Sequence, residues 1–495
     1  MNQAADAMLP APAAAPTIFG QPRGLATLFL TEMWERFTYY GMRAVLILFM
    51  AGAIAKGGLG LDDKTASSIY GLYLGSTYLL GLLGGWMADR LLGAQRAVVA
   101  GGVFIAAGNL LLALGNTAIF FIGLIVVAMG VGLLKPNVSA LVASLYPEGG
   151  SRRDAGFSFF YMGINLGAFL GSLLVPIAAA AFGWRYGFAL PALGMALGVV
   201  QFLYTRRYLN NAGVDIAHER GSWLPVIAFL ALVALVVALV LGGVIHLDAA
   251  LLAASASWAY ALLGIAYFVY LLCFAGLNAT ERKRALVMAV LFVASVTFWA
   301  GYEQQGASFN LFADRYTDRH ILGWNMPAGV LQAVNPFFVI TLAGVFAGVW
   351  IWLGRRGIDI AASTKFGAGL IFLGSGFLVM FFAARHVLAG ELVLPTWLLL
   401  TYLLHTFGEL CLSPVGLSYM SKLAPPRFVG QVMGVWFLSL ALGGNLAGQL
   451  SAQYDSTNLD SLPALFRHIF WFCVIAGVVM LALTPLMKRL MAGVK

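Results

Sequence analysis

The sequence predicts an all-α polytopic membrane protein that crosses the bilayer fourteen times. Its residues are 61% hydrophobic and only 10% charged, which is the composition of a membrane protein rather than a soluble one. Apolar runs of about 20 residues recur along nearly the whole chain, and each is long enough to cross a hydrocarbon core of about 30 Å. No segment alternates polar and apolar residues in ten-residue strands, so the sequence excludes an outer-membrane barrel.

The apolar runs fall into two blocks of six, separated by a central pair. The first block has runs at about 24–53, 66–91, 96–115, 118–144, 155–181 and 184–207. The second block has runs at about 285–312, 328–354, 364–387, 394–422, 428–451 and 464–487. The central pair, at about 222–246 and 250–276, is almost purely aliphatic, which is typical of a lipid-facing scaffold or connector. We therefore expect a disordered cytoplasmic tail at 1–22, a six-helix bundle at 23–208, a linker with two extra helices at 209–283 and a second six-helix bundle at 284–490.

Basic residues mark one side of the membrane. Most of the 29 Lys and Arg residues fall in alternate loops, as in Arg206-Arg207, Arg282-Lys283-Arg284 and Arg355-Arg356. By the positive-inside rule these loops are cytoplasmic, which puts both termini inside and requires an even number of helices. The net charge of +9 therefore reflects orientation in the lipid bilayer, and no nucleic-acid partner is expected.

The first apolar run carries a polar stripe at membrane depth. At 100° per residue, an arc of roughly 140° contains Glu32, Glu35, Arg36, Tyr39, Tyr40 and Arg43. A charge near the bilayer centre costs at least ~2.5–3.5 kcal/mol on insertion scales, so it persists only where it faces protein or a wet cavity. We expect the stripe to line a pathway. Glu32 and Arg36, four residues apart, also fit a static pair that only stabilises the helix.

Three further charges lie in apolar runs, and their placement suggests an internal repeat. Lys135, Glu303 and Glu409 fall in the fourth, seventh and tenth helices once the central pair is left out. With the first helix this gives a spacing of three helices, which four three-helix repeats, nested 3+3 within each half, would produce. The first half holds all the embedded cations, whereas the second half supplies only acids. A ligand with a carboxylate and an ammonium would therefore bridge the halves in one orientation.

Each of these three charges also has a plainer interpretation. Lys135 lies several residues from the end of its run and could snorkel toward an interface. Glu303, which two glutamines follow, could make a polar contact between helices, and Glu409 could pair locally with His405 one turn before it. These interpretations predict dispersed charges, whereas the pathway interpretation predicts that the charges converge.

Five motifs spread over both halves hold polar and charged residues at fixed spacings. They are Glu32-x-x-Glu35-Arg36-Phe37-x-Tyr39-Tyr40-Gly41, Gly84-Gly85-Trp86-x-Ala88-Asp89-Arg90, Lys135-Pro136-Asn137-x-Ser139, Phe160-Tyr161-x-x-Ile164-Asn165-x-Gly167 and Gly408-Glu409-x-x-x-Ser413-Pro414-x-Gly416. Together they resemble the motifs of the proton-dependent oligopeptide transporter family within the major facilitator superfamily. The central pair resembles the insertion of bacterial members. The resemblance implies a major facilitator fold of 6+6 helices plus two extra helices between the halves, in a bacterial inner membrane.

The resemblance also implies two sets of site residues. The substrate-binding set is Arg43, Lys135, Glu409, Asn165, Asn335, Tyr39, Tyr40, Tyr78, Trp299 and Trp436. The proton-coupling set is Glu32, Glu35, Arg36 and Glu303. Within the first set, Arg43 and Lys135 match positions that receive the carboxylate of a peptide, and Glu409 matches the acid that receives its ammonium. The second helix has no histidine where animal members have one, so imidazole chemistry there cannot carry the proton.

These roles lead to a hypothesis of competing ion pairs. A carboxylate removed from water can exchange a proton near physiological pH unless a cation holds it. Protonation of Glu303 would release Arg43, and an arriving peptide would separate Lys135 from Glu409. Both events break bridges between the halves, and so would permit the rocking that alternates access.

The sequence is expected to encode a monomeric, proton-coupled symporter that imports di- and tripeptides by alternating access. The proton gradient drives it, and no cofactor is expected. The alternative is a proton-coupled carrier of nitrate or another small anion on the same fold, although Glu303 and Glu409 would repel an anion. An enzyme is not expected, because the six His residues are scattered and no metal-ligand cluster or Ser-His-Asp arrangement lies at membrane depth. A channel is disfavoured because the charges do not form a ring of one sign.

Overall fold

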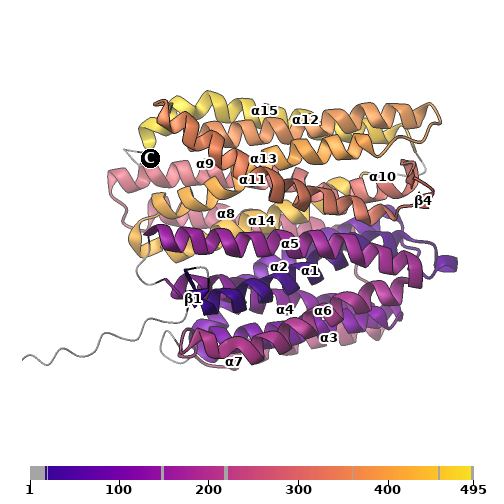
Figure 1. The fold of residues 1–495 in the computed structure, drawn as a ribbon, viewed down its shortest axis with the longest axis horizontal. Coiled ribbons are helices and arrows are strands. Elements are labelled where there is room, and N and C mark those ends of the chain that lie inside the picture. The colour runs from indigo at the N-terminus through magenta and orange to yellow at the C-terminus, as the bar shows by residue number, and fades with distance from the viewer. Residues whose placement is uncertain are drawn as a thin grey trace, which may run out of the picture.

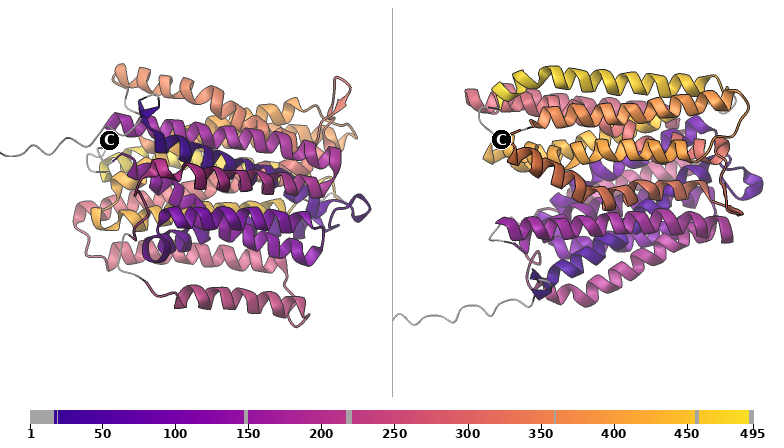
Figure 2. Two further views of the ribbon diagram at one scale, coloured as in Figure 1. Left: turned by 60° about the horizontal axis from the view of Figure 1, so that its bottom comes forward. Right: turned by 45° about the horizontal axis from the view of Figure 1, so that its top comes forward.

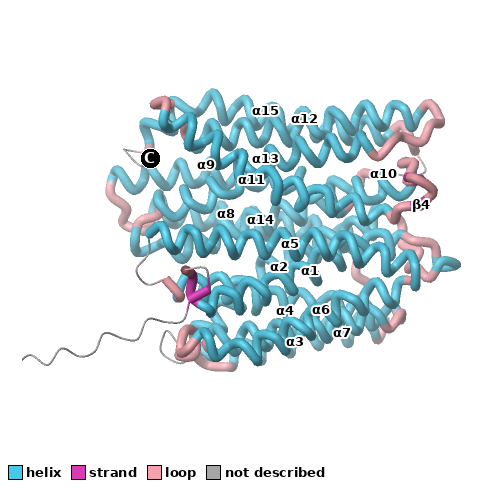
Figure 3. The backbone as a smooth tube through the Cα atoms, in the orientation of Figure 1, coloured by secondary structure: helices cyan, strands magenta, loops and turns pink. Residues whose placement is uncertain are grey.

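The structure is a computed structural model that describes residues 17–18, 20–146, 150–216, 221–358, 360–454 and 458–491. Within these residues it confirms the predicted all-α membrane fold (Figure 1; Figure 3). Twelve helices in the described part are long and apolar enough to cross a membrane. Helices α1 (Arg23–Ala51) and α2 (Asp63–Met87) complete the predicted fourteen. They are the polar members, because α1 carries the charged stripe and α2 is rich in Gly, Ser, Thr and Tyr.

The two halves of the chain occupy different parts of the molecule. In Figure 1 most first-half helices, coloured indigo to magenta, lie below the orange to yellow helices of the second half. The first half continues after α2 with α3 (Ala94–Ala113), α4 (Thr117–Ser144), α5 (Gly150–Phe182) and α6 (Trp184–Thr205). The second half contains α9 (Ala279–Tyr302), α10 (Ser308–Tyr316), α11 (Val334–Arg355), α12 (Ala362–Leu388), α13 (Thr396–Leu423), α14 (Val429–Ser451) and α15 (Ser461–Leu490).

Short elements modify two of the predicted runs. The run expected at 285–312 is broken, because α9 ends at Tyr302 and a 3-10 turn, η4 (Glu303–Gly306), precedes α10. The run expected at 328–354 begins as a second 3-10 segment, η5 (Ala328–Ala333). The remaining short helices are η1 (Ile54–Lys56), η2 (Ala88–Leu92), η3 (Arg206–Leu209) and η6 (Pro426–Phe428).

Two small antiparallel pairs lie at opposite ends of the helices. Strand β1 (Thr17–Ile18) pairs with β2 (Gln21–Pro22), so part of the tail expected to be disordered at 1–22 is ordered, while residues 1–16 lie outside the described residues. Strand β3 (His320–Ile321) pairs with β4 (Trp324–Asn325). Figure 1 shows the C-terminal end of the described chain at the same end of the helices as β1 and at the opposite end from β4, and Figure 2 shows this end from two further directions. Both ends of the described chain therefore lie at one end of the helices, as an even number of crossings requires.

Glycines let α1 and α5 pack backbone to backbone. A Cβ at Gly167 or Gly171 of α5 would collide with the carbonyl oxygen of Met33 or Phe37 of α1, respectively. Small residues permit such close approach between membrane helices. This contact fixes the rotation of α1 about its axis, and with it the direction of the polar stripe.

The central pair divides into one peripheral and one anchored helix. Helix α7 (Leu224–Leu241) is the more exposed of the two, because only 6% of its residues are buried, as expected of a lipid-facing helix. Helix α8 (Ala249–Cys273) instead fits the connector that the sequence also allowed. The amides of Asn445 and Gln449 on α14 donate to the carbonyl of Ala253 at 2.6 and 3.0 Å and to the hydroxyl of Ser257 at 2.8 and 2.6 Å. Because α8 also packs against α2, it touches both halves of the molecule.

Candidate functional site

Three members of the α1 stripe form one buried ion cluster. The Nε atom of Arg36 lies 2.7 Å from Oε1 of Glu32 and 2.7 Å from Oε2 of Glu35. Among the described residues, Glu32 Oε2 and Glu35 Oε1 have no hydrogen-bond partner. Two acids facing one cation leave the cluster with an unbalanced negative charge, which a proton would neutralise. This arrangement goes beyond the static one-to-one pair that the sequence left open.

Arg43 joins the two halves through an ion pair. Its Nη2 atom lies 2.9 Å from Oε2 of Glu303, the first residue of η4, and its Nε donates to the hydroxyl of Tyr70 on α2 at 2.8 Å. The Arg43 and Glu303 side chains are only 3% and 5% exposed. A Cβ at Gly306 would overlap the Tyr70 hydroxyl and lie 2.6 Å from Arg43 Nε. The broken helix at η4 therefore provides the space in which this pair forms.

Lys135 lies on α4 and contacts an aromatic ring rather than an acid. Its Nζ atom is 4.0 Å from the centroid of the Tyr78 ring on α2, a distance at which cation–π attraction operates. No carboxylate among the described residues lies within 4.0 Å of this amine. The bridge to Glu409 that the competing-pair hypothesis required is therefore absent from the described structure. Lys135 points toward Tyr78, so it does not follow the snorkelling interpretation either.

Glu409 on α13 is held by neutral groups of the second half. Its Oε2 atom accepts hydrogen bonds from the Tyr302 hydroxyl at 2.8 Å and from the Asn335 amide at 3.2 Å. The Asn335 amide also donates to the hydroxyl of Thr406 at 3.0 Å. No cation among the described residues lies within ion-pair distance of Glu409. The carboxylate thus has hydrogen bonds but no counter-charge.

His405 does not pair with Glu409. Both of its ring nitrogens lack a hydrogen-bond partner among the described residues. Its ring packs instead against Phe309 and Phe377, with ring centroids 5.5 and 5.2 Å away. The local His405–Glu409 interaction left open by the sequence is therefore wrong.

The predicted aromatic and amide residues separate into two groups. Tyr39 and Tyr40 place their rings 5.7 and 5.6 Å from the guanidinium carbons of Arg36 and Arg43, so with Tyr78 they accompany the embedded cations. Trp299 and Trp436 are 9% and 4% exposed. They pack tightly between helices of the second half, with Trp299 beside Gly443 and Trp436 beside Gly416. The Asn165 amide is also buried, and it donates to the Tyr161 carbonyl of its own helix at 2.9 Å.

The two halves are joined tightly at the end opposite the termini. Arg315 on α10 donates two hydrogen bonds of 2.7 Å to the two carboxylate oxygens of Asp63, the first residue of α2. The hydroxyls of Ser67 on α2 and Ser451 on α14 lie 3.2 Å apart. Beyond them, Gly71 and Gly448 bring the backbones of α2 and α14 into direct contact. This end of the space between the halves is closed.

Toward the termini, two residues of the predicted motifs are exposed. Ser139, one turn after Lys135, and Tyr161, one turn before Asn165, are both solvent-accessible. The structure therefore brings predicted charges of both halves together at Arg43 and Glu303, with the packed contacts on one side and these exposed residues on the other.

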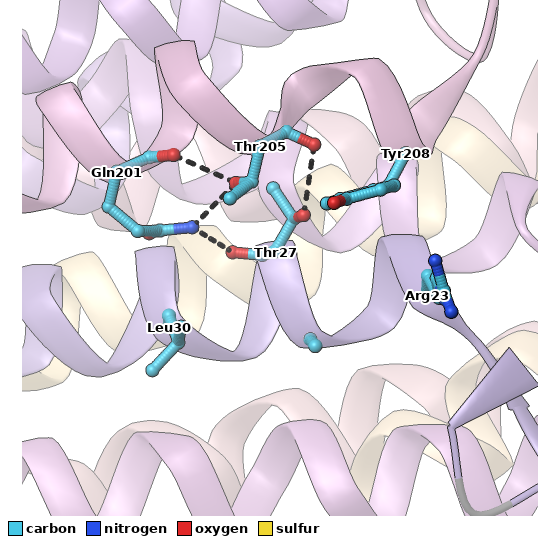
Figure 4. Close-up of a pocket in the computed structure, with 7 residues that line it drawn as sticks. Arg23, Thr27, Leu30, Gln201, Thr205 and Tyr208 are labelled. Carbon is cyan, nitrogen blue, oxygen red and sulfur yellow. Dashed lines mark hydrogen bonds between the residues drawn. The ribbon is translucent and has the colours of Figure 1, made fainter.

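A separate cleft between α1 and α6 is not this site. Its volume is about 160 Å³, and Figure 4 shows Thr27, Gln201 and Thr205 within it. The Gln201 amide donates to the Thr205 hydroxyl at 2.8 Å and to the Thr27 carbonyl at 3.4 Å, and the Thr27 hydroxyl donates to the Thr205 carbonyl at 3.3 Å. These polar groups satisfy one another, and none of the predicted site residues lines the cleft.

Sequence reasoning missed four residues of the charged site: Tyr70, Tyr302, Thr406 and Gly306. Tyr302 and Gly306 flank Glu303 closely in the chain, so proximity to an embedded acid was a usable signal. Tyr70 and Thr406 carry no comparable signal, because a single tyrosine or threonine in an apolar run is usually a packing residue. Their roles depend on contacts between helices.

A family model, curated relatives and a solved structure all match this chain over most of its length. A family model described as POT family matches residues 95–471. The "Peptide transporter YePEPT" of Yersinia enterocolitica subsp. palearctica is 42% identical over 494 residues, which cover 96% of each chain. A "Di-/tripeptide transporter" of Lactococcus lactis subsp. lactis is 31% identical over 493 residues, covering 97% of this chain and 98% of the relative. A crystal structure of "peptide transporter POT in complex with sulfate" has a TM-score of 0.89 and 41% identity, and covers 97% of both chains.

Proposed function

The chain belongs to the POT family, and on this premise we propose that it is a proton-coupled symporter that imports di- and tripeptides by alternating access. The similarity to named peptide transporters extends over at least 96% of the chain in each of the relatives described above. The proposal includes a monomeric, non-enzymatic carrier in a bacterial inner membrane. It needs no cofactor, because the proton gradient supplies the energy.

One observation carries the proposal: Lys135 and Glu409 are the embedded charges left without a counter-charge within ion-pair distance in the described structure. The other embedded charges all have an oppositely charged partner, since Arg36 pairs with Glu32 and Glu35, and Arg43 with Glu303. Uncompensated charges at membrane depth are costly. A peptide is a zwitterion, and its carboxylate and ammonium would supply the missing partners on the two walls at once.

The Arg43–Glu303 pair and the α1 cluster suggest where protons bind during the transport cycle. Protonation of Glu303 removes its charge and releases Arg43, which can then join Lys135 in binding the peptide carboxylate as a bidentate fork. The α1 cluster of Glu32, Glu35 and Arg36 offers a second place for a proton. Because the Arg43–Glu303 pair connects the halves, its release would allow one half to rock against the other.

The distribution of basic loops orients the carrier. The positive-inside rule puts the end with the termini in the cytoplasm. We infer that the closed end, at Asp63 and Arg315, is extracellular and that the carrier is inward-facing. Peptide would leave past the exposed residues Ser139 and Tyr161.

The proposal is tested with the purified protein in liposomes. Under an inward acid gradient we expect labelled dialanine to accumulate above its external concentration, and a protonophore to abolish this accumulation. Analysis of the vesicle contents should recover intact dipeptide, because the protein changes only its location. Equal uptake with and without the gradient, or cleaved product, would contradict a proton-driven carrier.

The anion-carrier alternative makes the opposite prediction in the same vesicles. An excess of nitrate should compete with dialanine if an anion is the natural substrate. We expect no competition, because the described hydrogen-bond partners of Glu409 are neutral and its negative charge would repel an anion. Inhibition by nitrate at concentrations similar to dialanine would favour the anion carrier.

Gly306 provides a test of the Arg43–Glu303 arrangement. We expect Gly306→Ala to lower the kcat/KM of dialanine uptake at least tenfold, a loss of about 1.4 kcal/mol. The reason is that the added methyl group overlaps the Tyr70 hydroxyl and displaces Arg43. Gly81→Ala on α2 is the matched control, because its Cβ meets no atom within 4 Å and uptake should stay unchanged. Wild-type uptake by the Gly306 variant would show that the tight contact is not needed.

A further inference from the structure

Tyr302 is a buried residue that neither the motifs nor the proposed function assigns to the site. It is the last residue of α9 and directly precedes Glu303. Its ring stacks on Phe298 at a centroid distance of 5.6 Å and meets the edge of Trp299 at 5.2 Å, and the side chain is 4% exposed. These contacts fix the ring, so the position of its hydroxyl is fixed as well.

The hydroxyl of Tyr302 lies between two acceptors that belong to different helices. It is 2.9 Å from Oδ1 of Asn335 on α11 and 2.8 Å from Oε2 of Glu409 on α13. A phenol has one proton, so it donates to one of these oxygens at a time. Tyr302 therefore links α9, α11 and α13 at a single point.

The other donors around Glu409 are already committed. The Asn335 amide supplies one hydrogen bond to Thr406 and one to Glu409 Oε2. The Thr406 hydroxyl gives its own proton to the Tyr402 carbonyl at 2.8 Å. In the described structure Oε2 of Glu409 thus receives a hydrogen bond from Asn335 and, when the Tyr302 proton points toward it, a second one, whereas Oε1 has no hydrogen-bond partner. The network leaves one defined oxygen of a half-buried carboxylate unoccupied.

We propose that Tyr302 is a positioning residue that sets the requirement for a free amino group on the substrate. By holding Oε2, the Tyr302 hydroxyl directs Oε1 of Glu409 into the substrate space, where it receives the ammonium of the peptide. A hydrogen-bonded carboxylate keeps one direction, whereas a freely rotating one would spread its charge over several. This inference rests on the proposed function, because it assumes that Glu409 binds the ammonium of a peptide.

The test compares two ligands that differ only at the amino group. Unlabelled dialanine and N-acetyl-dialanine compete against trace labelled dialanine in proteoliposomes. The half-inhibitory concentration of N-acetyl-dialanine divided by that of dialanine measures discrimination for the free amino group. We expect Tyr302→Phe to reduce this ratio about tenfold, which corresponds to about 1.4 kcal/mol, by weakening dialanine alone. The Phe variant keeps the ring stacking with Phe298 and removes only the hydroxyl.

Tyr402→Phe is the matched control. Tyr402 is fully buried on the same helix as Glu409, and its hydroxyl has no hydrogen-bond partner among the described residues. The control should keep the wild-type ratio. A Tyr302→Phe protein with an unchanged ratio, or with both ligands weakened equally, overturns the positioning role alone. Wild-type protein that binds no dialanine overturns the proposed function and this inference with it.

Discussion

Glu303→Gln is expected to abolish the accumulation of dialanine against its gradient while exchange of dialanine across the membrane continues. Glutamine has nearly the shape of glutamate but cannot carry the proton, so Arg43 loses its ionic partner permanently. The variant would resemble the protonated state throughout the cycle. We expect proton-driven accumulation to fall at least tenfold, to the equilibrium level, and counterflow exchange to stay within about twofold of wild type, a barrier change of about 0.4 kcal/mol.

The measurement uses the same liposomes with and without an acid gradient. Glu391→Gln is the control, because Glu391 is an exposed acid on the loop after α12, and its one ion-pair contact within the described residues is with His386, at 3.7 Å. This control should accumulate peptide normally. Accumulation by the Glu303 variant that still responds to the proton gradient would remove Glu303 from the coupling path, and would point to the α1 cluster instead.

Asp63→Asn is expected to open the closed end of the carrier. The Arg315–Asp63 contact is bidentate, with both hydrogen bonds at 2.7 Å, and the two side chains are only 26% and 11% exposed. A hydrogen bond to a charged partner contributes about 1.5–3 kcal/mol, so its weakening should shift the balance toward the open form about tenfold or more. A cysteine at Ser67, which is fully buried beneath this pair, reports the opening.

The readout is labelling of Ser67→Cys by a membrane-impermeant maleimide, in a background without Cys273, Cys411 and Cys473. Asp62→Asn is the matched control in the same turn. Asp62 accepts from the Thr65 amide as the N-cap of α2, and asparagine caps a helix equally well. We expect labelling to accelerate about tenfold or more with Asp63→Asn and to stay constant with Asp62→Asn. Equal labelling in the two variants would show that the Asp63–Arg315 pair does not hold this end closed.

The positions of most membrane helices could be predicted from the lengths of the apolar runs, because the bilayer imposes a minimum length on every crossing. The run expected at 118–144 is helix α4 (Thr117–Ser144), and the run expected at 428–451 is α14 (Val429–Ser451). The same criterion could not show the break at Glu303–Gly306. Hydropathy records how apolar a segment is, whereas a change from an α-helix to a 3-10 turn depends on what packs around it.

The charged residues of the candidate site could be picked out from the sequence, but the groups that they contact could not. Helical periodicity placed Glu32, Glu35 and Arg36 on one face, and the structure joins them in one cluster. Periodicity within one helix cannot report a contact with a distant segment. The bridge expected between Lys135 and Glu409 is therefore where the prediction failed.

The number of membrane crossings, their positions and the helices that carry charge follow from the amino-acid sequence, because the cost of burying a polar group in lipid is a property of each segment. Which charges meet, and which stay without a partner, follows from the packing of the helices. Such contacts require particular helix rotations and separations, and these are set by close backbone packing at sites such as Gly167 against Met33 and Gly71 against Gly448. Hydrogen bonds and ion pairs act over a few ångströms, so no local pattern could fix them.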